Sequence, residues 1–577
     1  MKEVSFMSWE QVYEQWMNSD KLDEKMQQEL KALDKDAELK QDAFYTSLEF
    51  GTAGMRGILG PGTNRMNIFT IRQATEGLAR FMDTQDEQTK KRGVAIAYDS
   101  RHMSPEFAME AARTLAAHDI PSYVFESLRP TPELSFAVRH LNAFTGIMIT
   151  ASHNPAEYNG YKVYGEDGGQ MPPEDADALT KFVRSVENPL EVEVLQDENS
   201  KLITIIGAEV DAAYLEEIKA VTIDQALINE MGKNLKLVYT PLHGTGTMLG
   251  EKALKQAGFE EYMLVPEQAV ADPDFSTVKS PNPEEHSAFE YAIKLGEKEG
   301  ADLLIATDPD ADRLGAAVRL PSGEYQVLTG NQIGAILIRY ILEAHKQAGD
   351  LPENAAVLKS IVSSELPTAI AKAYNTEMID VLTGFKFIAE KIQQYEKDGS
   401  HTFMFGFEES YGYLIKPFVR DKDAIQALLL LAEVAAYYKK QDKTLYDGLQ
   451  EIFEEYGYFA EKTISVTLSG AEGAAKIKEI LEGLRAQAPT EFAGVPVSLT
   501  EDYLTQKATD SNGASTPIDM PSSNVLKYTL EDATWLAIRP SGTEPKIKFY
   551  IGVKGSSEED AENKLATYEA AIRKITE

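Results

Sequence analysis

Residues 94–150 read VAIAYDSRHMSPEFAMEAARTLAAHDIPSYVFESLRPTPELSFAVRHLNAFTGIMIT and carry the pattern from which the fold can be predicted. Three short apolar runs in it have the length and residue types of buried strands: Val94–Tyr98, Ser122–Phe125 and Phe144–Thr150. Two segments with helical periodicity separate them, Pro105–Ala117 and Pro132–Leu141. This alternation predicts an α/β fold with a parallel or mixed sheet covered by helices.

The same alternation restarts twice downstream. The second group is predicted to consist of strand 236–240, helix 248–256, strand 262–265, helix 288–300 and strand 303–307. The third is predicted to consist of helix 331–347, strand 356–362, helix 366–373, strand 376–382, helix 388–397 and strand 402–405. The last part of the chain favours a smaller α+β unit, with strands 463–468, 534–538 and 547–553, helices 474–487 and 558–575, and a polar loop at 506–523.

Composition limits the class of protein. A chain of 577 residues exceeds the ~250–300 residues at which single cores stop growing, so several domains are expected. The formal charge of −35 repels nucleic acid and anionic membranes, and we expect neither as a partner. The chain has no cysteine, which excludes disulfides, thiolate catalysis and iron–sulfur clusters. Residues 1–33 lack the apolar stretch of a signal peptide, so we expect a cytoplasmic protein.

Polar loops follow strands in each part of the chain: Thr150–Pro155, Asp308–Arg313, Gly406–Ser410 and Arg539–Pro545. In open α/β sheets, ligands bind outside the carboxyl ends of the strands. We therefore expect one loop from each of four domains at a shared central cleft. The predicted domains are 1–205, 206–323, 324–450 and 451–577.

The first loop contains Ser152, which stands beside His153 and precedes Lys162 by ten residues. A serine on a tight loop with basic neighbours is a candidate nucleophile. Ser, Asn, Pro and Gly are also ordinary turn residues, and local chemistry alone favours a plain turn.

The second loop places Asp308, Asp310 and Asp312 at alternate positions, where carboxylates can converge on a hard cation. An EF-hand is excluded, because Arg313 and Arg319 stand where that motif requires Gly and Glu. The small number of oxygens is more typical of magnesium than of calcium. The alternative is a solvated acidic turn, although three adjacent carboxylates repel one another.

The other loops are weaker signals. The Arg539–Lys548 segment combines an arginine, hydroxyls and a glycine, which suits either a phosphate cradle or a hairpin turn. Glu408 and Ser410 could recognise sugar hydroxyls. The Gly244–Gly250 segment imitates a dinucleotide fingerprint, but its glycine spacing is broken, so we interpret it as a close-packed turn and disfavour an oxidoreductase.

Taken together and in this order, the four loops resemble the signatures of the α-D-phosphohexomutase superfamily. The Gly51–Gly57 segment, with Arg56, also resembles an N-terminal motif of that family. The resemblance spans nearly the whole chain and reverses the local preference for a plain turn at Ser152. The chain length and Ser280–Glu285 are similar to the branch of bacterial phosphoglucomutases related to animal phosphopentomutases.

The resemblance implies a mutase that interconverts glucose 1-phosphate and glucose 6-phosphate through a phosphoserine at Ser152. It implies glucose 1,6-bisphosphate as the activating intermediate, and three α/β domains of related topology plus a smaller C-terminal one. The implied ligands of Mg²⁺ are a phosphate oxygen on Ser152 and the carboxylates of Asp308, Asp310 and Asp312. Arg56 is expected to assist the transfer, and the proton carrier is left open among His153, Lys162 and Lys422. The implied substrate-binding residues are Thr383, Gly384, Lys386, Glu408, Ser410, Arg313, Arg420, Arg539, Ser541, Gly542, Thr543 and Lys548.

The sequence leaves alternative functions open. Phe407 and Tyr411 depart from the usual hexose loop, which leaves a phosphopentomutase open. A phosphomannomutase is less favoured, because a tyrosine stands where that family commonly has a histidine. An inactive sugar-phosphate-binding scaffold would be expected to have lost Ser152 or a metal carboxylate, and all are present. The expected partners are small-molecule sugar phosphates, for a monomer or a weak homo-oligomer.

Overall fold

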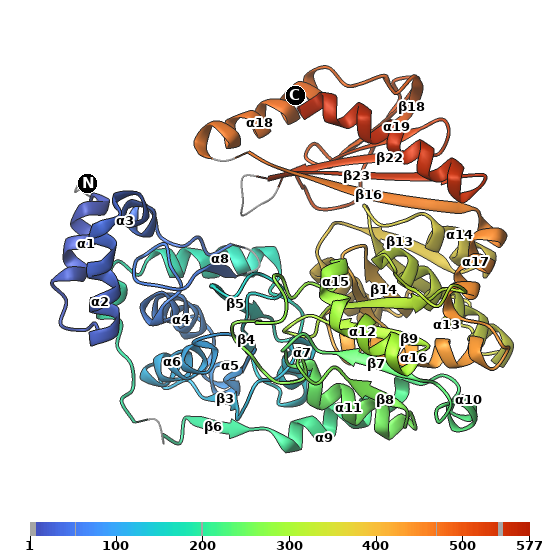
Figure 1. Ribbon diagram of the computed structural model, residues 1–577. Helices are drawn as coiled ribbons and strands as arrows, with labels where there is room; N and C mark the ends of the chain where they lie inside the picture. The colour runs from blue at the N-terminus through green and yellow to red at the C-terminus, as the bar shows by residue number, and fades with distance from the viewer. Residues whose placement is uncertain (1–6, 52–53, 198–199, 469, 541–545, 577) are drawn as a thin grey trace. The chain divides into compact units, whose positions relative to one another are not determined.

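The computed structural model describes residues 7–51, 54–197, 200–468, 470–540 and 546–576 (Figure 1). These divide into two compact units. The first unit consists of Met1–Leu328, Ala389–Asp398 and Ser410–Thr444, and the second of Thr329–Ile388, Gly399–Glu409 and Leu445–Glu577.

The first sheet contains the three strands predicted within residues 94–150. Its strand order is β1 (Met55–Ile58), β5 (Tyr158–Tyr164), β4 (Thr145–Ile149), β2 (Val94–Tyr98), β3 (Ser122–Phe125) and β6 (Ile203–Ile206). The pairs among β2, β3, β4 and β6 are parallel, whereas β5 runs antiparallel to both of its neighbours.

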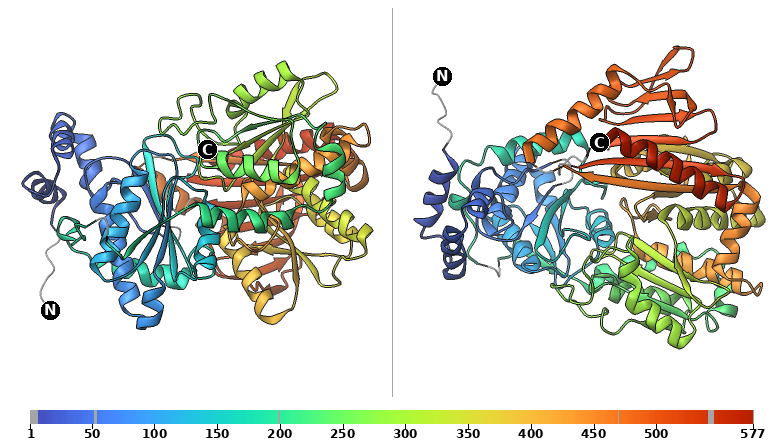
Figure 2. Two further views of the ribbon diagram at one scale, coloured as in Figure 1. Left: turned by 90° about the horizontal axis from the view of Figure 1, so that it is seen from below. Right: turned by 45° about the horizontal axis from the view of Figure 1, so that its top comes forward.

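Helices cover both sides of this sheet (Figure 2). From β2 the chain passes through α6 (Ser104–Ala117) to β3, and then through α7 (Thr131–His140) back across β2 to β4. Because the direction reverses, right-handed crossovers put α6 and α7 on opposite faces. On the α6 side, α4 (Ile68–Asp83) packs between α6 and α8 (Pro173–Arg184). The short α5 spans Glu87–Arg92.

The N-terminal helices are α1 (Trp9–Met17), α2 (Glu24–Ala32) and α3 (Ala37–Phe44). They share a small apolar cluster with the first residues of α4. Trp16 is its centre, because its ring contacts those of Phe44 and Phe69 edge to face. These helices therefore rest on the first sheet domain through aromatic packing.

The second sheet has the order β11 (Tyr325–Val327), β10 (Leu314–Arg319), β9 (Leu303–Thr307), β7 (Leu237–Thr240) and β8 (Tyr262–Leu264). Its helices are α9 (Ala208–Ile218), α10 (Gln225–Met231), α11 (Gly246–Ala257) and α12 (Glu290–Glu299). The apolar helix α16 (Ala424–Lys439) comes from far along the chain and packs on α10, α11 and β9. It also follows the short strand β15 (Gly412–Leu414) of the same unit.

The second unit has two sheets. Parallel strands β13 (Glu377–Val381), β12 (Ala355–Ser360) and β14 (Thr402–Glu408) accompany α13 (Gly330–Ala348), α14 (Leu366–Ala373) and α17 (Leu445–Tyr456). Helix α15 spans Phe385–Asp398.

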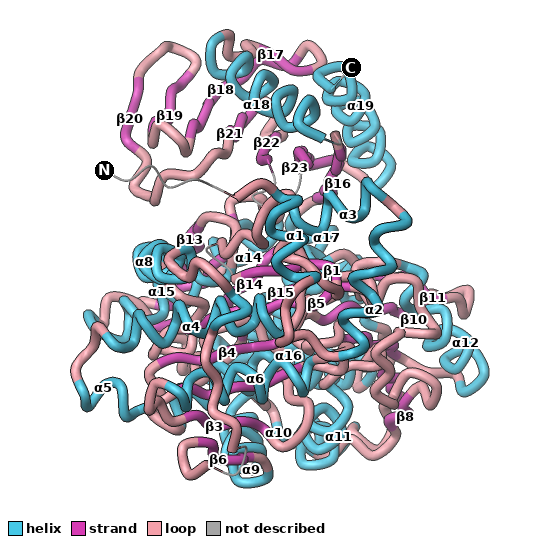
Figure 3. The backbone as a smooth tube through the Cα atoms, turned by 90° about the vertical axis from the view of Figure 1, so that its left-hand side faces the viewer, coloured by secondary structure: helices cyan, strands magenta, loops and turns pink. Residues whose placement is uncertain are grey.

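The C-terminal sheet is antiparallel, and Figure 3 shows its order from β20 to β16. The strands in that order are β20 (Ser515–Pro517), β19 (Lys507–Asp510), β18 (Val495–Asp502), β21 (Leu526–Leu530), β22 (Trp535–Pro540), β23 (Lys546–Gly555) and β16 (Tyr458–Thr467). The short β17 (Glu491–Phe492) pairs with β18, and the helices are α18 (Gly470–Ala486) and α19 (Glu558–Thr576).

The α/β fold with a smaller C-terminal α+β part is confirmed. The loop predicted at 506–523 is wrong in part, because β19 and β20 form a solvated hairpin there. Strand β14 continues through Glu408, so three residues of the predicted Gly406–Ser410 loop belong to a strand. The helix predicted to start at residue 388 starts at Phe385. Within the described residues, none of the helices has both the length and the apolar character needed to cross a bilayer.

Candidate functional site

Ser152 lies in the loop that follows β4, in a backbone conformation that L-residues rarely adopt. Its φ is 54°, and the residue is only 2% exposed. Its backbone N–H donates to Thr150 Oγ1 at 2.8 Å, and that hydroxyl donates to Asp99 Oδ2 at 2.6 Å. Asp99 follows β2, the neighbouring strand, so two strand ends hold the serine. Left-handed backbone in a non-glycine residue persists only where surrounding bonds enforce it.

Arg101 holds the same loop through hydrogen bonds to its backbone carbonyl oxygens. Its side chain is fully buried, and its Nε lies 3.2 Å from Asp99 Oδ2. One terminal nitrogen donates to the Ser152 carbonyl at 2.7 Å, and the other donates to the Pro155 carbonyl at 2.7 Å. A planar guanidinium with several donors thereby organises several carbonyl oxygens of one loop.

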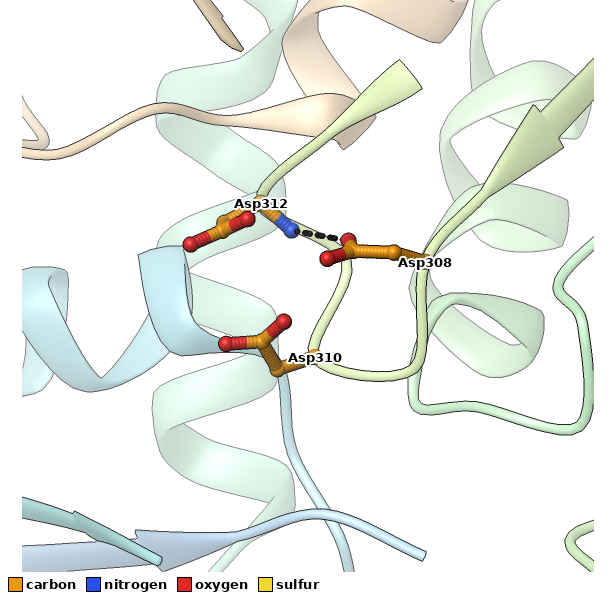
Figure 4. A group of neighbouring side chains, drawn as sticks. All are labelled: Asp308, Asp310 and Asp312. Atoms are coloured by element: carbon orange, nitrogen blue, oxygen red, sulfur yellow. Dashed lines mark hydrogen bonds between the residues drawn. The ribbon is translucent and has the colours of Figure 1, made fainter. Parts of the chain in front are cut away.

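The three predicted metal carboxylates converge in the loop that follows β9 (Figure 4). Asp308, Asp310 and Asp312 are at most 2% exposed, and each offers an oxygen within 4.8 Å of the others. Asp308 Oδ1 accepts from the backbone N–H groups of Asp312 at 3.1 Å and of Arg313 at 3.0 Å. Ser152 Oγ donates to Asp308 Oδ2 at 3.0 Å, so the candidate nucleophile touches the acidic group.

Two buried lysines face these carboxylates. Lys162, on β5, places its Nζ 2.8 Å from Asp310 Oδ2. Lys422 places its Nζ 3.1 Å from Asp312 Oδ2. Burial and then the charges of Asp310 and Asp312 raise the pKa of Asp308 well above its usual value. Burial, the largest single cause, acts in the same direction on Asp310, but the charge of Lys162 and the hydrogen bonds to this carboxyl together outweigh it and lower its pKa.

The acidic group fits a hard cation. Asp310 Oδ1 and Asp312 Oδ1 are buried, and neither has a hydrogen-bond partner among the residues that the structure describes. Buried acceptors without donors are costly, and a divalent ion would satisfy both oxygens while offsetting the repulsion around Asp308. The three carboxylates could therefore hold a metal ion.

His153 contacts the serine directly, with its Nδ1 3.2 Å from Ser152 Oγ. Burial, then the charges of Arg313 and Arg56, lower the pKa of His153 well below its usual value. Its ring is therefore neutral at pH 7 and a weak proton acceptor. Arg56 extends from β1 and donates to Asn154 Oδ1 at 3.4 Å.

Arg313 and Arg420 differ in their surroundings. Arg313 Nη1 donates to the Ser410 carbonyl at 3.1 Å and to Glu284 Oε1 at 2.6 Å, so it joins the acidic loop to the end of the predicted sugar loop. Arg420 is 0% exposed, and its guanidinium contacts Glu396 and the Pro417 carbonyl. The structure therefore brings Arg313, but not the guanidinium of Arg420, to the acidic group.

The remaining predicted residues lie in the second unit. Gly384 N–H donates to Glu408 Oε1 at 2.7 Å, while Lys386 is the second residue of α15. Thr383 Oγ1 is buried without a hydrogen-bond partner in the described parts of the chain. Arg539 on β22 is the register partner of Lys548 on β23. Ser541, Gly542 and Thr543 lie outside the described residues.

Sequence reasoning missed several supporting residues. Asp99 and Arg101 directly follow a predicted strand, and that position could have signalled them. Thr131 donates from its Oγ1 to Asp310 Oδ2 at 2.8 Å, and Glu284 pairs with Arg313. Neither has a local signal, because each meets its partner only in the folded chain.

Comparison with known proteins gives matches along most of the chain. Four family models match in order: phosphoglucomutase/phosphomannomutase alpha/beta/alpha domain I at residues 47–189, domain II at 212–321, domain III at 329–456 and the C-terminal domain at 475–570. A phosphoglucomutase of Staphylococcus aureus is 42% identical over 529 residues, which cover 91% of this chain and 93% of the relative.

Two solved structures share the fold. A putative phosphomannomutase from Thermus thermophilus has a TM-score of 0.67 and 22% identity, covering 92% of this chain and 99% of that one. The phosphoglucomutase pp63/parafusin from Paramecium, in an open form, has a TM-score of 0.65 and 17% identity, covering 92% of this chain and 95% of that one.

Proposed function

The chain belongs to the phosphoglucomutase/phosphomannomutase family, and we propose that it is a phosphoglucomutase that interconverts glucose 1-phosphate and glucose 6-phosphate through phosphorylated Ser152. The observation that carries this proposal is the 3.0 Å contact between Ser152 Oγ and Asp308 Oδ2, within a buried group of three carboxylates. A plain turn would need neither the burial nor the acidic neighbours. The 42% identity to the Staphylococcus aureus phosphoglucomutase supports glucose as the sugar.

In the proposed first half-reaction, a free hydroxyl oxygen of the sugar monophosphate forms a bond to phosphorus. The bond between phosphorus and Ser152 Oγ breaks, and the product is glucose 1,6-bisphosphate. The bisphosphate then turns around, Ser152 Oγ attacks its other phosphorus, and the isomeric monophosphate leaves. Mg²⁺ held by Asp308, Asp310, Asp312 and a phosphate oxygen on Ser152 would neutralise charge on the transferring group.

Proton transfer is assigned to Lys162 or Lys422. The ammonium would give a proton to the departing Ser152 Oγ, and the neutral amine that it becomes would take the proton of the attacking sugar hydroxyl. Both ammonium groups lie beside the acidic group, at 2.8 Å from Asp310 and 3.1 Å from Asp312. The low pKa of His153 makes its imidazole the weakest base of the three candidates. Its contact with Ser152 Oγ fits a role in orienting the serine hydroxyl instead. Arg56 and Arg313 supply positive charge for the phosphoryl oxygens.

Substrate recognition is assigned to the predicted sugar and phosphate residues. Glu408, Ser410, Thr383, Gly384 and Lys386 would read the hydroxyls. The distal phosphate would be bound by the phosphate loop, whose members are Arg539, Ser541, Gly542, Thr543 and Lys548. Such a cradle suits a site that must accept the substrate in two orientations.

The phosphopentomutase alternative was based on Phe407 and Tyr411, and the positions of these two residues no longer support it. Phe407 is fully buried, and its ring lies 2.8 Å from the position that a Cβ on Gly334 would take. Tyr411 is also buried and donates from its hydroxyl to the Leu328 carbonyl at 3.2 Å. Both aromatic residues pack in cores, which explains their departure from the usual loop without reference to sugar size.

The proposal is tested by kinetics and intact mass together. We expect kcat/KM for glucose 1-phosphate to exceed the values for mannose 1-phosphate and ribose 1-phosphate. We expect the purified protein, incubated with glucose 1,6-bisphosphate, to gain the mass of one phosphoryl group at Ser152. The Ser152→Ala variant should keep the wild-type melting temperature and lose turnover. Mutase activity at the wild-type rate in that variant would exclude the phosphoserine mechanism.

A further inference from the structure

The segment Ser280–Glu285 has no role in the proposed reaction. It nevertheless packs against β10, the strand that follows the acidic loop Asp308–Arg313. The Pro283 carbonyl oxygen is 2.4 Å from the position that a Cβ on Gly315 would take. Gly315 is on β10, whose first residue directly follows Arg313. Only a glycine lets the segment approach this strand so closely.

The backbone around Glu284 is held firmly. Pro281 and Pro283 are buried, and each proline ring fixes its own φ and restricts the residue before it. Asn282 Oδ1 accepts from the Glu284 N–H at 3.1 Å, and the Asn282 carbonyl accepts from the Glu285 N–H at 3.0 Å. The Glu284 carboxylate is therefore presented from a rigid support.

That carboxylate contacts Arg313, with Oε1 2.6 Å from Nη1. The same nitrogen donates to the Ser410 carbonyl, and the backbone of Arg313 forms a β-bridge with Gly412. The side chains of Arg313 and Glu284 are 20% and 34% exposed. The guanidinium thus lies between the acidic loop and the end of the predicted sugar loop, at the edge of solvent.

We propose that Glu284 is a positioning residue of the mutase: its carboxylate holds the Arg313 guanidinium in place before a phosphorylated sugar binds. The inference rests on the proposed function, because it gives Arg313 a phosphoryl group to bind. Arginine is among the side chains that lose most conformational freedom when they are fixed. A carboxylate that fixes it in advance removes that cost from substrate binding and from the transition state.

A purely structural ion pair predicts something different. Exposed and half-exposed pairs contribute little to folding stability, so the loss of this one would hardly change the melting temperature. A positioning role instead predicts a loss of rate that depends on Arg313 being present. Both readings leave the melting temperature nearly unchanged, so the rate and its coupling to Arg313 separate them.

The test compares the wild type with E284Q, R313Q and the double variant E284Q/R313Q, in steady state and in single-turnover transfer from the phosphoenzyme. The matched control is E285Q, because Glu285 is the exposed neighbour on the same segment. We expect E284Q to lower kcat/KM about tenfold, mainly through kcat, with an unchanged melting temperature. E285Q should match the wild type. In the R313Q background, E284Q should cause no further loss.

Three results would overturn the inference. These are wild-type kinetics in E284Q, an equal loss from E284Q with and without Arg313, or a large fall in the melting temperature of E284Q. If the wild type itself converts no sugar phosphate, the proposed function fails and the inference fails with it. If the wild type is active and E284Q is unaffected, the inference alone fails.

Discussion

Thr131 acts on the candidate metal group from a helix that carries none of its carboxylates. Its backbone N–H donates to the Asp310 carbonyl at 2.9 Å, and its Oγ1 donates to Asp310 Oδ2 at 2.8 Å. Lys162 contacts the same oxygen. Both donors thus engage Oδ2 and leave Oδ1 as the oxygen without a hydrogen-bond partner among the described residues. Outer partners of this kind orient a ligand for its ion.

Thr131→Val removes the hydroxyl but keeps the shape of the side chain. We expect the affinity for Mg²⁺ to fall by about 10–100-fold, because Asp310 loses a donor that orients it. Mn²⁺ binding, followed by electron paramagnetic resonance, and the Mg²⁺ dependence of activity would both measure this. Thr567→Val, at an exposed position on α19, should change neither. Unaltered Mn²⁺ affinity in Thr131→Val would exclude the orienting role.

At the level of secondary-structure elements, the turn at Gly244 and Thr245 supports the acidic loop Asp308–Arg313. The turn before α11, which imitates a dinucleotide fingerprint, packs on the acidic loop. Thr245 donates to the Pro309 carbonyl from its N–H at 2.8 Å and from its Oγ1 at 3.0 Å. A Cβ on Gly244 would lie 2.4 Å from Pro309 Cα. The glycine in this turn therefore serves close packing against the acidic loop.

Gly244→Ala should displace Pro309 and, with it, Asp308 and Asp310. We expect at least a tenfold loss of kcat/KM, since misplacement of this size costs up to about 100-fold, and weaker binding of Mn²⁺. Gly483→Ala is the control, because a Cβ there meets nothing within 4 Å. Alanine in the middle of α18 should leave activity unchanged and stabilise the helix by about 0.5–1 kcal/mol. Full activity in Gly244→Ala would contradict the supporting role.

A second contact between elements depends on pH. His118 is the C-cap residue of α6. Its Nε2 lies 2.8 Å from Glu76 Oε2 and its Nδ1 lies 2.9 Å from Asp83 Oδ2, both on α4. The hydrogen bond to Glu76, then that to Asp83, raises the pKa of His118 although burial acts against them. Because the folded-state pKa exceeds the unfolded one, the stabilisation is complete below about pH 6.5 and is lost as pH rises through the folded-state value.

His118→Gln should therefore destabilise the protein more at pH 6 than at pH 9. Hydrogen bonds to charged groups contribute about 1.5–3 kcal/mol, and we expect a difference of that order in the free energy of unfolding at pH 6. Urea unfolding at the two pH values measures it. The control is His140→Gln, at the end of α7. An equal effect of His118→Gln at both pH values would exclude charge as the source of the contact's strength.

At the scale of the whole molecule, the dominant feature is charge. The chain has 92 acidic and 57 basic residues, a formal charge of −35. Like charges repel one another in the compact state, and salt screens them over a Debye length of about 8 Å at physiological ionic strength. The candidate site differs from this acidic surface in its local charge, because four cationic side chains lie near Ser152: Lys162, Lys422, Arg56 and Arg313. A local cluster of cations thus offsets a repulsive surface.

The melting temperature should rise when NaCl increases from 10 to 150 mM, by about 2–4 °C for each 1 kcal/mol gained in a domain of 150–250 residues. Differential scanning fluorimetry with NaCl and with choline chloride would measure this, and similar shifts with both salts would point to screening. A melting temperature that falls with both salts would show that attractive surface pairs outweigh the repulsion.

Local patterns predicted nine strands of the first three sheets, because buried strands are short apolar runs: β2, β3, β4, β7, β8, β9, β12, β13 and β14. In these sheets they missed β1, β6, β10, β11 and β15, as well as β5. Strand β5 was missed because Tyr158–Tyr164 is polar and contains a glycine; its partner β4 directly precedes it in the chain, and its other partner, β1, lies far upstream. The hairpin of β19 and β20 was missed for the same reason: its strands are half-exposed or exposed along their length. Packing against neighbouring strands, more than an apolar pattern, decides such strands.

The site residues also fall into two groups: those that the sequence pattern predicted and those that it did not. Asp308, Asp310 and Asp312 are neighbours in sequence, so their spacing predicted the group that the structure brings together. Thr131 and Glu284 act across 179 and 29 residues of chain, distances over which no local pattern carries information. The resemblance to a family, in turn, supplied roles that spacing could not.

The geometry at Ser152 bears on attempts to imitate its phosphorylated form. An aspartate beside Asp308 would be a poor phosphomimetic, because a carboxylate carries one negative charge where a phosphoserine carries about two. It would bring a fourth negative charge to a buried trio while offering fewer oxygens than a phosphate offers to a cation. Substitution by aspartate is commonly used to imitate phosphorylation in signalling proteins. Here Ser152→Asp should therefore yield a destabilised protein and not a stable imitation of the phosphoenzyme.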